Sequence, residues 1–198
     1  AEAGAPVTVA GNDYAANVSL YGDPDTSQLR YVQSHVSGSD GISITAADNA
    51  NLARLEWLLV TGANRDGVHY TNFSGLIKDL LVIHSPGLFP PGIDQGVGGR
   101  AGIRAGGNPT KAPLIVNATL VGRDNSQALP GNFSREFGLL FEDGLTSVRI
   151  ANMAIANFRN GCYEIGENNE FGENVDLSSM ALLSPAANDS NFVDGVHC

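Results

Sequence analysis

LEWLLVTGANRDGVHY, residues 55–70, is the stretch that decides the fold: an apolar strand, a glycine turn and a second apolar strand. Apolar residues alternate along both halves, as in strands that bury one face. This alternation places Trp57 in the core, together with its neighbouring leucines. Asp66 and Gly67 divide the halves, and such a pair makes a turn because the Asx side chain caps the backbone and glycine accepts positive φ. The stretch therefore predicts one strand–turn–strand unit.

The same plan recurs along the chain. Aligned on the turn glycine, the other units are LRYVQSHVSGSDGISI (29–44), IKDLLVIHSPG with an excursion to AGIRA (77–105), LIVNATLVGRDNS with an excursion to FGLLF (114–141), and VRIANMAIANFRNGCYEI (148–165). The turn glycines Gly41, Gly67, Gly102, Gly138 and Gly161 lie 26, 35, 36 and 23 residues apart. Repeats of roughly 20 to 50 residues are typical of solenoids, in which each unit buries its apolar face against the next. We predict an all-β, right-handed parallel β-helix of about six irregular coils.

One domain, 1–198, is expected, because the length suits one core and no linker interrupts the composition. Within it we expect an N-terminal strand segment (1–27), core coils (28–166) and an irregular C-terminal coil (167–198). The two long glycine intervals contain SPGLFPPGIDQGVGGR and GRDNSQALPGNFSRE, which are rich in residues that break strands. They predict two long inserted loops, at 86–107 and 123–137.

The charge balance excludes some partners. Eleven Lys and Arg stand against 21 Asp and Glu, giving a net charge of -10, which repels nucleic acid. No apolar run is long enough to span a bilayer, so we expect no membrane insertion. The N-terminal AEAGAPVTVAG resembles a mature end left by signal-peptide cleavage, although a trimmed chain would look the same. We expect a secreted protein, extracellular or at the cell surface.

Two cysteines are present, Cys162 and Cys198, and they lack the C-x-x-C spacing of zinc or redox sites. One disulfide between them is one hypothesis. Two unrelated thiols is the other.

The units LRYVQ...GSDGISI, LEWLLVTGANRDGVHY and VRIANMAIANFRNGCYEI together resemble the coils of the pectate-lyase-like right-handed parallel β-helix superfamily. The resemblance covers residues 28–166 and is nearest to large secreted bacterial β-helix proteins without an assigned activity. Its motifs are turn-and-strand patterns, so they are specific for architecture. For the enzymes of this superfold, the resemblance implies paired carboxylates, or an arginine base with calcium-bridged acids, on one external sheet.

The hydrolase pattern of that superfamily, N-x-D, D-D, G-H-G and R-x-K, is represented here only by NRDG at 64–67. If the chain is an enzyme, Asp66, His69 and Arg65 are the candidate acid, base and anion clamp. Turn formation accounts for Asp66 without catalysis, so we expect a protein that is not an enzyme.

A binding rim is a second candidate site. Arg100 and Arg104 flank AGI beside the first long loop, and with Phe89 they could contact a ligand, since inserted loops often form the recognition face of a solenoid. A solvated loop with two stray charges is the alternative interpretation.

Calcium is the one cofactor that the composition suggests. Asp23 and Asp25, and Glu167 and Glu173, gather oxygen ligands in turns, but no EF-hand loop or calcium-binding repeat is present. A merely acidic surface is the better supported interpretation.

The ends of the predicted solenoid suggest its function. The sequence shows no polar cap, and FVDGVHC at the C-terminus repeats the DGVH phrase of the turn at 66–69. Open ends permit head-to-tail stacking into filaments, so we expect a non-catalytic structural or adhesive protein whose partner is itself. A fragment of a longer β-helix would end in the same way. The rival hypothesis is a carbohydrate-active enzyme or glycan-binding module that uses the two long loops to hold a polysaccharide.

Overall fold

The computed structural model describes the chain in thirteen stretches. These are residues 7–9, 12–14, 18–21, 28–37, 39–45, 53–63, 65–84, 100–107, 113–122, 136–141, 148–158, 161–165 and 192–197. Every regular element in this part of the chain is a strand, and within it no helix has the length and hydropathy needed to cross a membrane. The predicted all-β class is confirmed.

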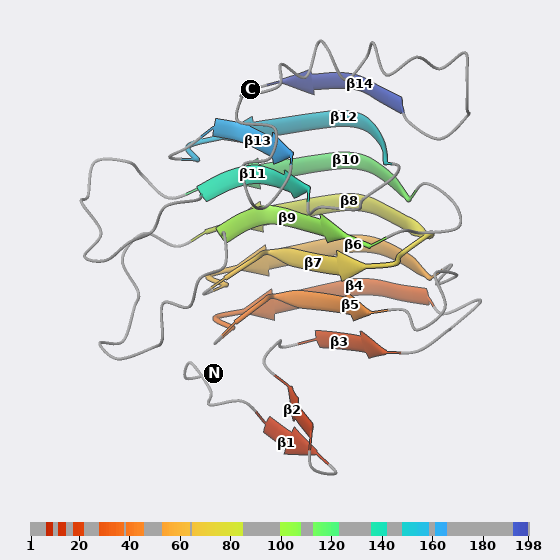
Figure 1. The fold of residues 1–198 in the computed structure, drawn as a ribbon, viewed down its shortest axis with the longest axis vertical. Coiled ribbons are helices and arrows are strands. Elements are labelled where there is room, and N and C mark those ends of the chain that lie inside the picture. The colour runs from red at the N-terminus through yellow and green to blue at the C-terminus, as the bar shows by residue number, and fades with distance from the viewer. Residues whose placement is uncertain are drawn as a thin grey trace.

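Two six-stranded parallel sheets contain all the described strands from β3 to β14 (Figure 1). One, the β4–β14 sheet, contains β4 (Gln28–His35), β6 (Arg54–Thr61), β8 (Leu76–Ile83), β10 (Leu114–Val121), β12 (Arg149–Ala156) and β14 (Phe192–His197). The other, the β3–β13 sheet, contains β3 (Val18–Tyr21), β5 (Ile42–Thr45), β7 (Val68–Thr71), β9 (Arg100–Gly106), β11 (Glu136–Phe141) and β13 (Gly161–Ile165). A short antiparallel pair, β1 (Val7–Val9) and β2 (Asn12–Tyr14), precedes them.

The chain alternates between the sheets and moves on by one strand at each return. We call one strand of the β4–β14 sheet, with the strand of the β3–β13 sheet that follows it, a repeat unit. The pairing register aligns the positions that the sequence repeat aligns. For example, Ile42 pairs with Val68, Val68 with Ile103, and Ile103 with Leu139. The repeat therefore reflects a register in which equivalent residues stack.

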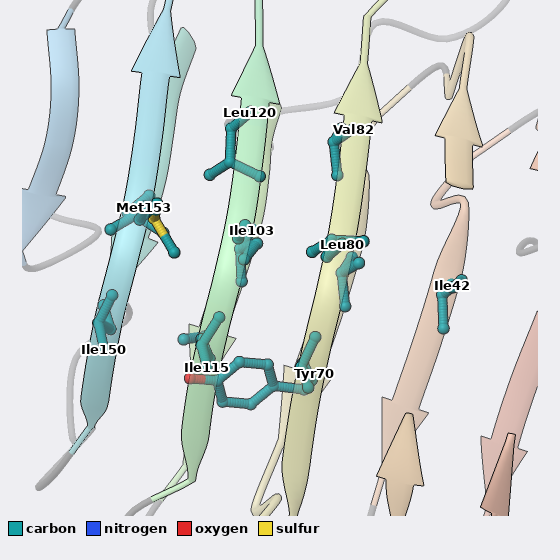
Figure 2. Close-up of a cluster of buried hydrophobic side chains, with 14 of the residues drawn as sticks. Ile42, Tyr70, Leu80, Val82, Ile103, Ile115, Leu120, Ile150 and Met153 are labelled. Carbon is teal, nitrogen blue, oxygen red and sulfur yellow. The ribbon is translucent and has the colours of Figure 1, made fainter. Parts of the chain in front are cut away.

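The core lies between the two sheets, where these stacked apolar columns meet. Figure 2 shows side chains from both sheets, such as Tyr70, Leu80 and Ile115, gathered in one buried cluster. Ile42, Val68 and their partners further along the column are fully buried. Burying one such aliphatic side chain contributes about 1.5–3 kcal/mol, so the columns supply the main stabilising term.

The turn glycines are required by close packing between units. A Cβ at Gly67 would lie 2.6 Å from the carbonyl oxygen of Gly102 and would also clash with Val82. Only Gly161 among the five turn glycines has a positive φ, 139°. The expectation that these glycines relieve backbone strain is therefore wrong for the other four, where the next unit approaches too closely for any side chain.

The prediction of Trp57 as a core residue is also wrong. Trp57 is 51% exposed and stacks on Tyr31, with ring centroids 6.0 Å apart. Its φ is 60°, and the ladder between β4 and β6 skips this position, passing from Glu56 to Leu58. Because this left-handed residue turns the strand, the alternation shifts by one and Leu58, not Leu59, faces the core.

The same left-handed position recurs in the next units. Asp79, Asn117 and Asn152 have φ between 55° and 57°, and their side chains form a ladder along the sheet. Asn117 Nδ2 donates to Asp79 Oδ1 at 2.9 Å, and Asn152 Nδ2 donates to Asn117 Oδ1 at 2.8 Å. Asn and Asp suit this column because their short polar side chains tolerate the left-handed region.

The first predicted loop, 86–107, extends too far. Residues Arg100–Gly106 form β9, because Ile103 and Ala105 continue the buried columns of β7. Likewise β11 begins at Glu136, inside the predicted loop 123–137. Residues 86–99 and 123–135 of the two loops, and residues 167–191 and 198 of the predicted C-terminal coil, lie outside the described residues.

Gly67→Ala tests the close approach between units. The added Cβ must push against the main chain of Gly102, so the free energy of unfolding should fall by about 2 kcal/mol. Urea denaturation followed by circular dichroism measures the change. Thr119→Ala, an exposed strand position, should cost much less. Equal losses in the two variants would show that the glycine is not needed for packing.

Candidate functional site

The candidate site lies where three consecutive repeat units enter the β3–β13 sheet. Asp40 and Asp66 stand in the turns before β5 and β7, each directly followed by a turn glycine. His69 lies on β7 and pairs across the ladder with Arg104 on β9. Because the units are in register, residues 26 to 38 positions apart in sequence meet here.

Asp66 is fully buried and bonded to the following unit. Its Oδ1 accepts a hydrogen bond from the backbone N–H of Ala101 at 2.7 Å. Its Oδ2 has no hydrogen-bond partner among the described residues, and Arg104 Nη1 lies 4.0 Å from it. One carboxylate oxygen therefore joins two units, and the other faces a guanidinium group beyond hydrogen-bond distance.

Asp40 repeats this arrangement one unit earlier. Its Oδ1 accepts from the backbone N–H of Asp66 at 3.2 Å, and its Oδ2 lies 3.3 Å from His69 Nδ1. Arg65 Nε is 3.8 Å from Oδ1. The two aspartates thus form a relay in which each carboxylate caps the main chain of the next unit.

The two carboxyl groups have opposite pKa shifts. Burial, followed by the negative charge of Asp40, raises the pKa of Asp66 to about 7, against the opposing effects of the Ala101 N–H and Arg104. Burial also acts to raise the pKa of Asp40. There it is outweighed by the hydrogen bond with His69 and by the charge of Arg65, so the pKa of Asp40 is lowered.

Solvent reaches only part of the site. Arg104 is 7% exposed and Leu140, next to it on β11, is fully buried, although both alternate with the core residues of their strands. The side chain of His69 is 22% exposed and that of Arg65 is 42% exposed. Any ligand would therefore approach from the side of His69 and Arg65.

The structure brings together the three residues proposed for catalysis, Asp66, His69 and Arg65, around Asp40. Asp40 was not among the candidate residues predicted from the sequence. The signal that could have found it is the recurrence of Asp-Gly one unit apart, since stacked turns place the two carboxylates next to each other.

The predicted binding rim is placed differently. Arg104 lies inside β9 and joins Asp66, rather than standing in a loop. Arg100 is the first residue of β9, and Phe89 lies outside the described residues. The weak calcium candidates Asp23, Asp25, Glu167 and Glu173 also fall outside them.

Cys162 on β13 is disulfide-bonded. Cys198, the only other cysteine in the sequence, lies outside the described residues, and its pairing with Cys162 stays a prediction.

Comparisons with known proteins identify no relative. No family model, no curated protein and no solved structure matches the chain. The resemblance to the pectate-lyase-like superfamily therefore stays a prediction.

The raised pKa of Asp66 predicts a distinct pH dependence of the free energy of unfolding. Its pKa of about 7 in the folded protein lies above the reference value of 3.8, so the folded state binds this proton more tightly than the unfolded chain. The resulting stabilisation is complete below about pH 4 and is lost as the pH rises toward 7. Asp40 acts in the opposite sense. Because its pKa is lowered in the folded protein, its carboxylate stabilises the fold at neutral pH, and this contribution is lost only as the pH falls below about 4.

Thermal unfolding of Asp66→Asn in EDTA buffer between pH 4.5 and 8 tests this prediction. The natural chain should lose stability as the pH rises, and the variant should lose less, because Asn keeps the acceptor for Ala101 but carries no proton to release. Asp79→Asn, in the other sheet, should follow the natural chain. Parallel curves for Asp66→Asn and the natural chain would contradict the assignment.

Proposed function

We propose that the protein is a right-handed parallel β-helix that serves as a secreted, non-catalytic structural or adhesive protein and self-associates through its ends. The strict alternation of the chain between two parallel sheets supports the helical path. Parallel strands of one sheet are joined almost always by right-handed crossovers, which supports the hand. A disulfide at Cys162 supports an oxidising, extracellular compartment.

The contacts of the polar side chains with neighbouring units support a structural role. Asp40 and Asp66 each cap the next unit, and Asn152, Asn117 and Asp79 form a ladder along the other sheet. These contacts stabilise the stacking of units. A catalytic acid must contact its substrate, whereas Asp66 is fully buried.

The edge strands of the two sheets support the proposal of self-association. Among the described strands, β4 and β14 at the two edges of one sheet, and β3 and β13 at those of the other, pair on one side only. A parallel edge strand can template another strand, and the register that joins units within the chain would then join copies. A head-to-tail contact of this kind extends into a filament unless the rotation closes.

The outer face of the β4–β14 sheet offers a competing contact surface. From β4 to β12, one column of paired residues there has no charged side chain: Gln33, Leu59, Leu81, Thr119 and Ala154. On β14 the same column ends at His197. Ile83, which lies two residues after Leu81 on the same strand, is 38% exposed. Copies of a chain with a net charge of -10 repel one another least where such uncharged faces meet. Face-to-face pairing would give a closed dimer instead of a filament.

The second candidate function is carbohydrate processing or glycan binding. It is favoured by the two neighbouring carboxyl groups whose pKa values move in opposite directions, an arrangement that acid–base catalysts use. His69 and Arg65 would then be the groups that a polysaccharide reaches. The burial of Asp66 makes this candidate the weaker of the two.

Gln33→Lys and Thr119→Lys form a matched pair that separates the contacts. Both positions are exposed and lie in the same outer column, Gln33 on the edge strand β4 and Thr119 on the inner strand β10. A lysine on an edge strand opposes strand addition. We expect Gln33→Lys to lower the mean particle mass at least fivefold, measured by light scattering and electron microscopy over a concentration series, with little effect of Thr119→Lys.

If instead Thr119→Lys lowers the particle mass and Gln33→Lys does not, the copies associate face to face and not end to end. Strict monomers at all concentrations would overturn self-association. Depolymerisation of any polysaccharide in a broad screen, lost in Asp40→Asn, would overturn the non-catalytic proposal in favour of the carbohydrate-active one.

A further inference from the structure

We propose that Asp40, Asp66 and His69 bind one divalent transition-metal cation of the Zn²⁺ class, which clips two consecutive repeat units together. This inference goes beyond the proposed function and does not depend on self-association. Each of the three residues offers one ligand atom, and these three atoms all lie within 4.8 Å of one another. They come from the turn before β5, the turn before β7 and β7 itself, which are neighbours in the sheet (Figure 1).

The main chain already orients both carboxylates. In each aspartate, Oδ1 accepts a backbone N–H of the following unit, from Asp66 to Asp40 and from Ala101 to Asp66. This leaves Oδ2 of each as the oxygen that could bind a cation. In Asp40 this oxygen lies 3.3 Å from His69 Nδ1, a contact that a bound cation would replace. Ligands of a metal site are characteristically held in this way by hydrogen bonds from a surrounding shell.

The free oxygen of Asp66 points to a missing ligand. Oδ2 belongs to a side chain with no solvent exposure and has no hydrogen-bond partner among the described residues. Buried carboxylate oxygens are nearly always satisfied, since an unsatisfied one is strongly destabilising. A cation beside Asp40 Oδ2 and His69 would satisfy it.

Two arginines compete for the same carboxylates. Arg65 Nε lies 3.8 Å from Asp40 Oδ1, and Arg104 Nη1 lies 4.0 Å from Asp66 Oδ2. Both distances exceed the roughly 2.7–2.9 Å of a charge-assisted hydrogen bond, so neither guanidinium occupies these oxygens directly. Their positive charges nevertheless oppose a cation. Removing the more exposed one, Arg65, should therefore strengthen metal binding.

The ligand set selects the class of cation. Two carboxylates and an imidazole suit Zn²⁺ or a similar transition metal, which binds such donors at about 2.0–2.2 Å. Side-chain shifts of under about 1 Å would bring the three atoms to that distance. Calcium prefers six to eight oxygen ligands at roughly 2.3–2.6 Å and fits poorly. Partial exposure of His69 leaves access for water as a fourth ligand.

Titration calorimetry of the EDTA-treated, dialysed full chain with ZnCl₂, and separately with CaCl₂, tests the site. We expect saturable binding of one Zn²⁺ per chain, a rise in Tm on Zn²⁺ addition, and no matching response to Ca²⁺. His69→Gln should weaken Zn²⁺ binding at least tenfold. This substitution is preferred to Asp66→Asn because His69 is partly exposed and its loss should not prevent folding.

Two further variants sharpen the result. His35→Gln, on the exposed side of β4 in the other sheet, controls for adventitious surface histidine binding and should leave the Zn²⁺ affinity unchanged. Arg65→Gln should tighten it severalfold. The proposal fails if Zn²⁺ does not bind saturably, if His35→Gln weakens binding as much as His69→Gln, or if Arg65→Gln weakens it. None of these outcomes bears on whether the protein forms filaments.

Discussion

Main-chain pairing between successive repeat units is the constraint on which the rest of the structure depends. Parallel strands lie about 4.8 Å apart, so every position in one unit stands directly over its equivalent in the next. Apolar positions become continuous buried columns such as that of Ile42, Val68 and Ile103. Turn positions become stacks in which Gly67 faces the carbonyl of Gly102. One spacing therefore decides where side chains are excluded and where they must pack.

The same stacking creates the polar features. A column of identical or similar side chains repeats each contact from unit to unit, as the Asn and Asp residues of the β4–β14 sheet do. At the turns, stacking brings Asp40 close enough to Asp66 for the negative charge of Asp40 to oppose the ionisation of Asp66. The main-chain bonds that hold them there offset this repulsion. The site is thus a consequence of the pairing register. Its local stability depends on whether the two carboxyl groups are charged.

Sequence reasoning succeeded where a property belongs to one unit and repeats. Strand alternation and turn glycines predicted the strands, their parallel pairing and the equivalence of residues between units. It failed where a backbone state changes the alternation, as at Trp57, whose left-handed φ no hydropathy pattern reveals. It also failed for side chains whose environment comes from neighbouring units. Asp40 gains its role from Asp66 and His69, and Arg104 is buried although it alternates with core residues.

The aspartate relay makes the units unequal. Hydrogen-bonded sheets and apolar columns are indifferent to which unit follows which, so a unit could be duplicated or exchanged with little loss of pairing. The carboxylates are selective, because Asp66 bonds to Ala101 and lies near Arg104 only when β9 is the strand next to β7 in the sheet. Recombination within the chain would therefore be tolerated at most unit boundaries and penalised at this one. The relay marks the three units from β5 to β9 as a block that must be inherited together.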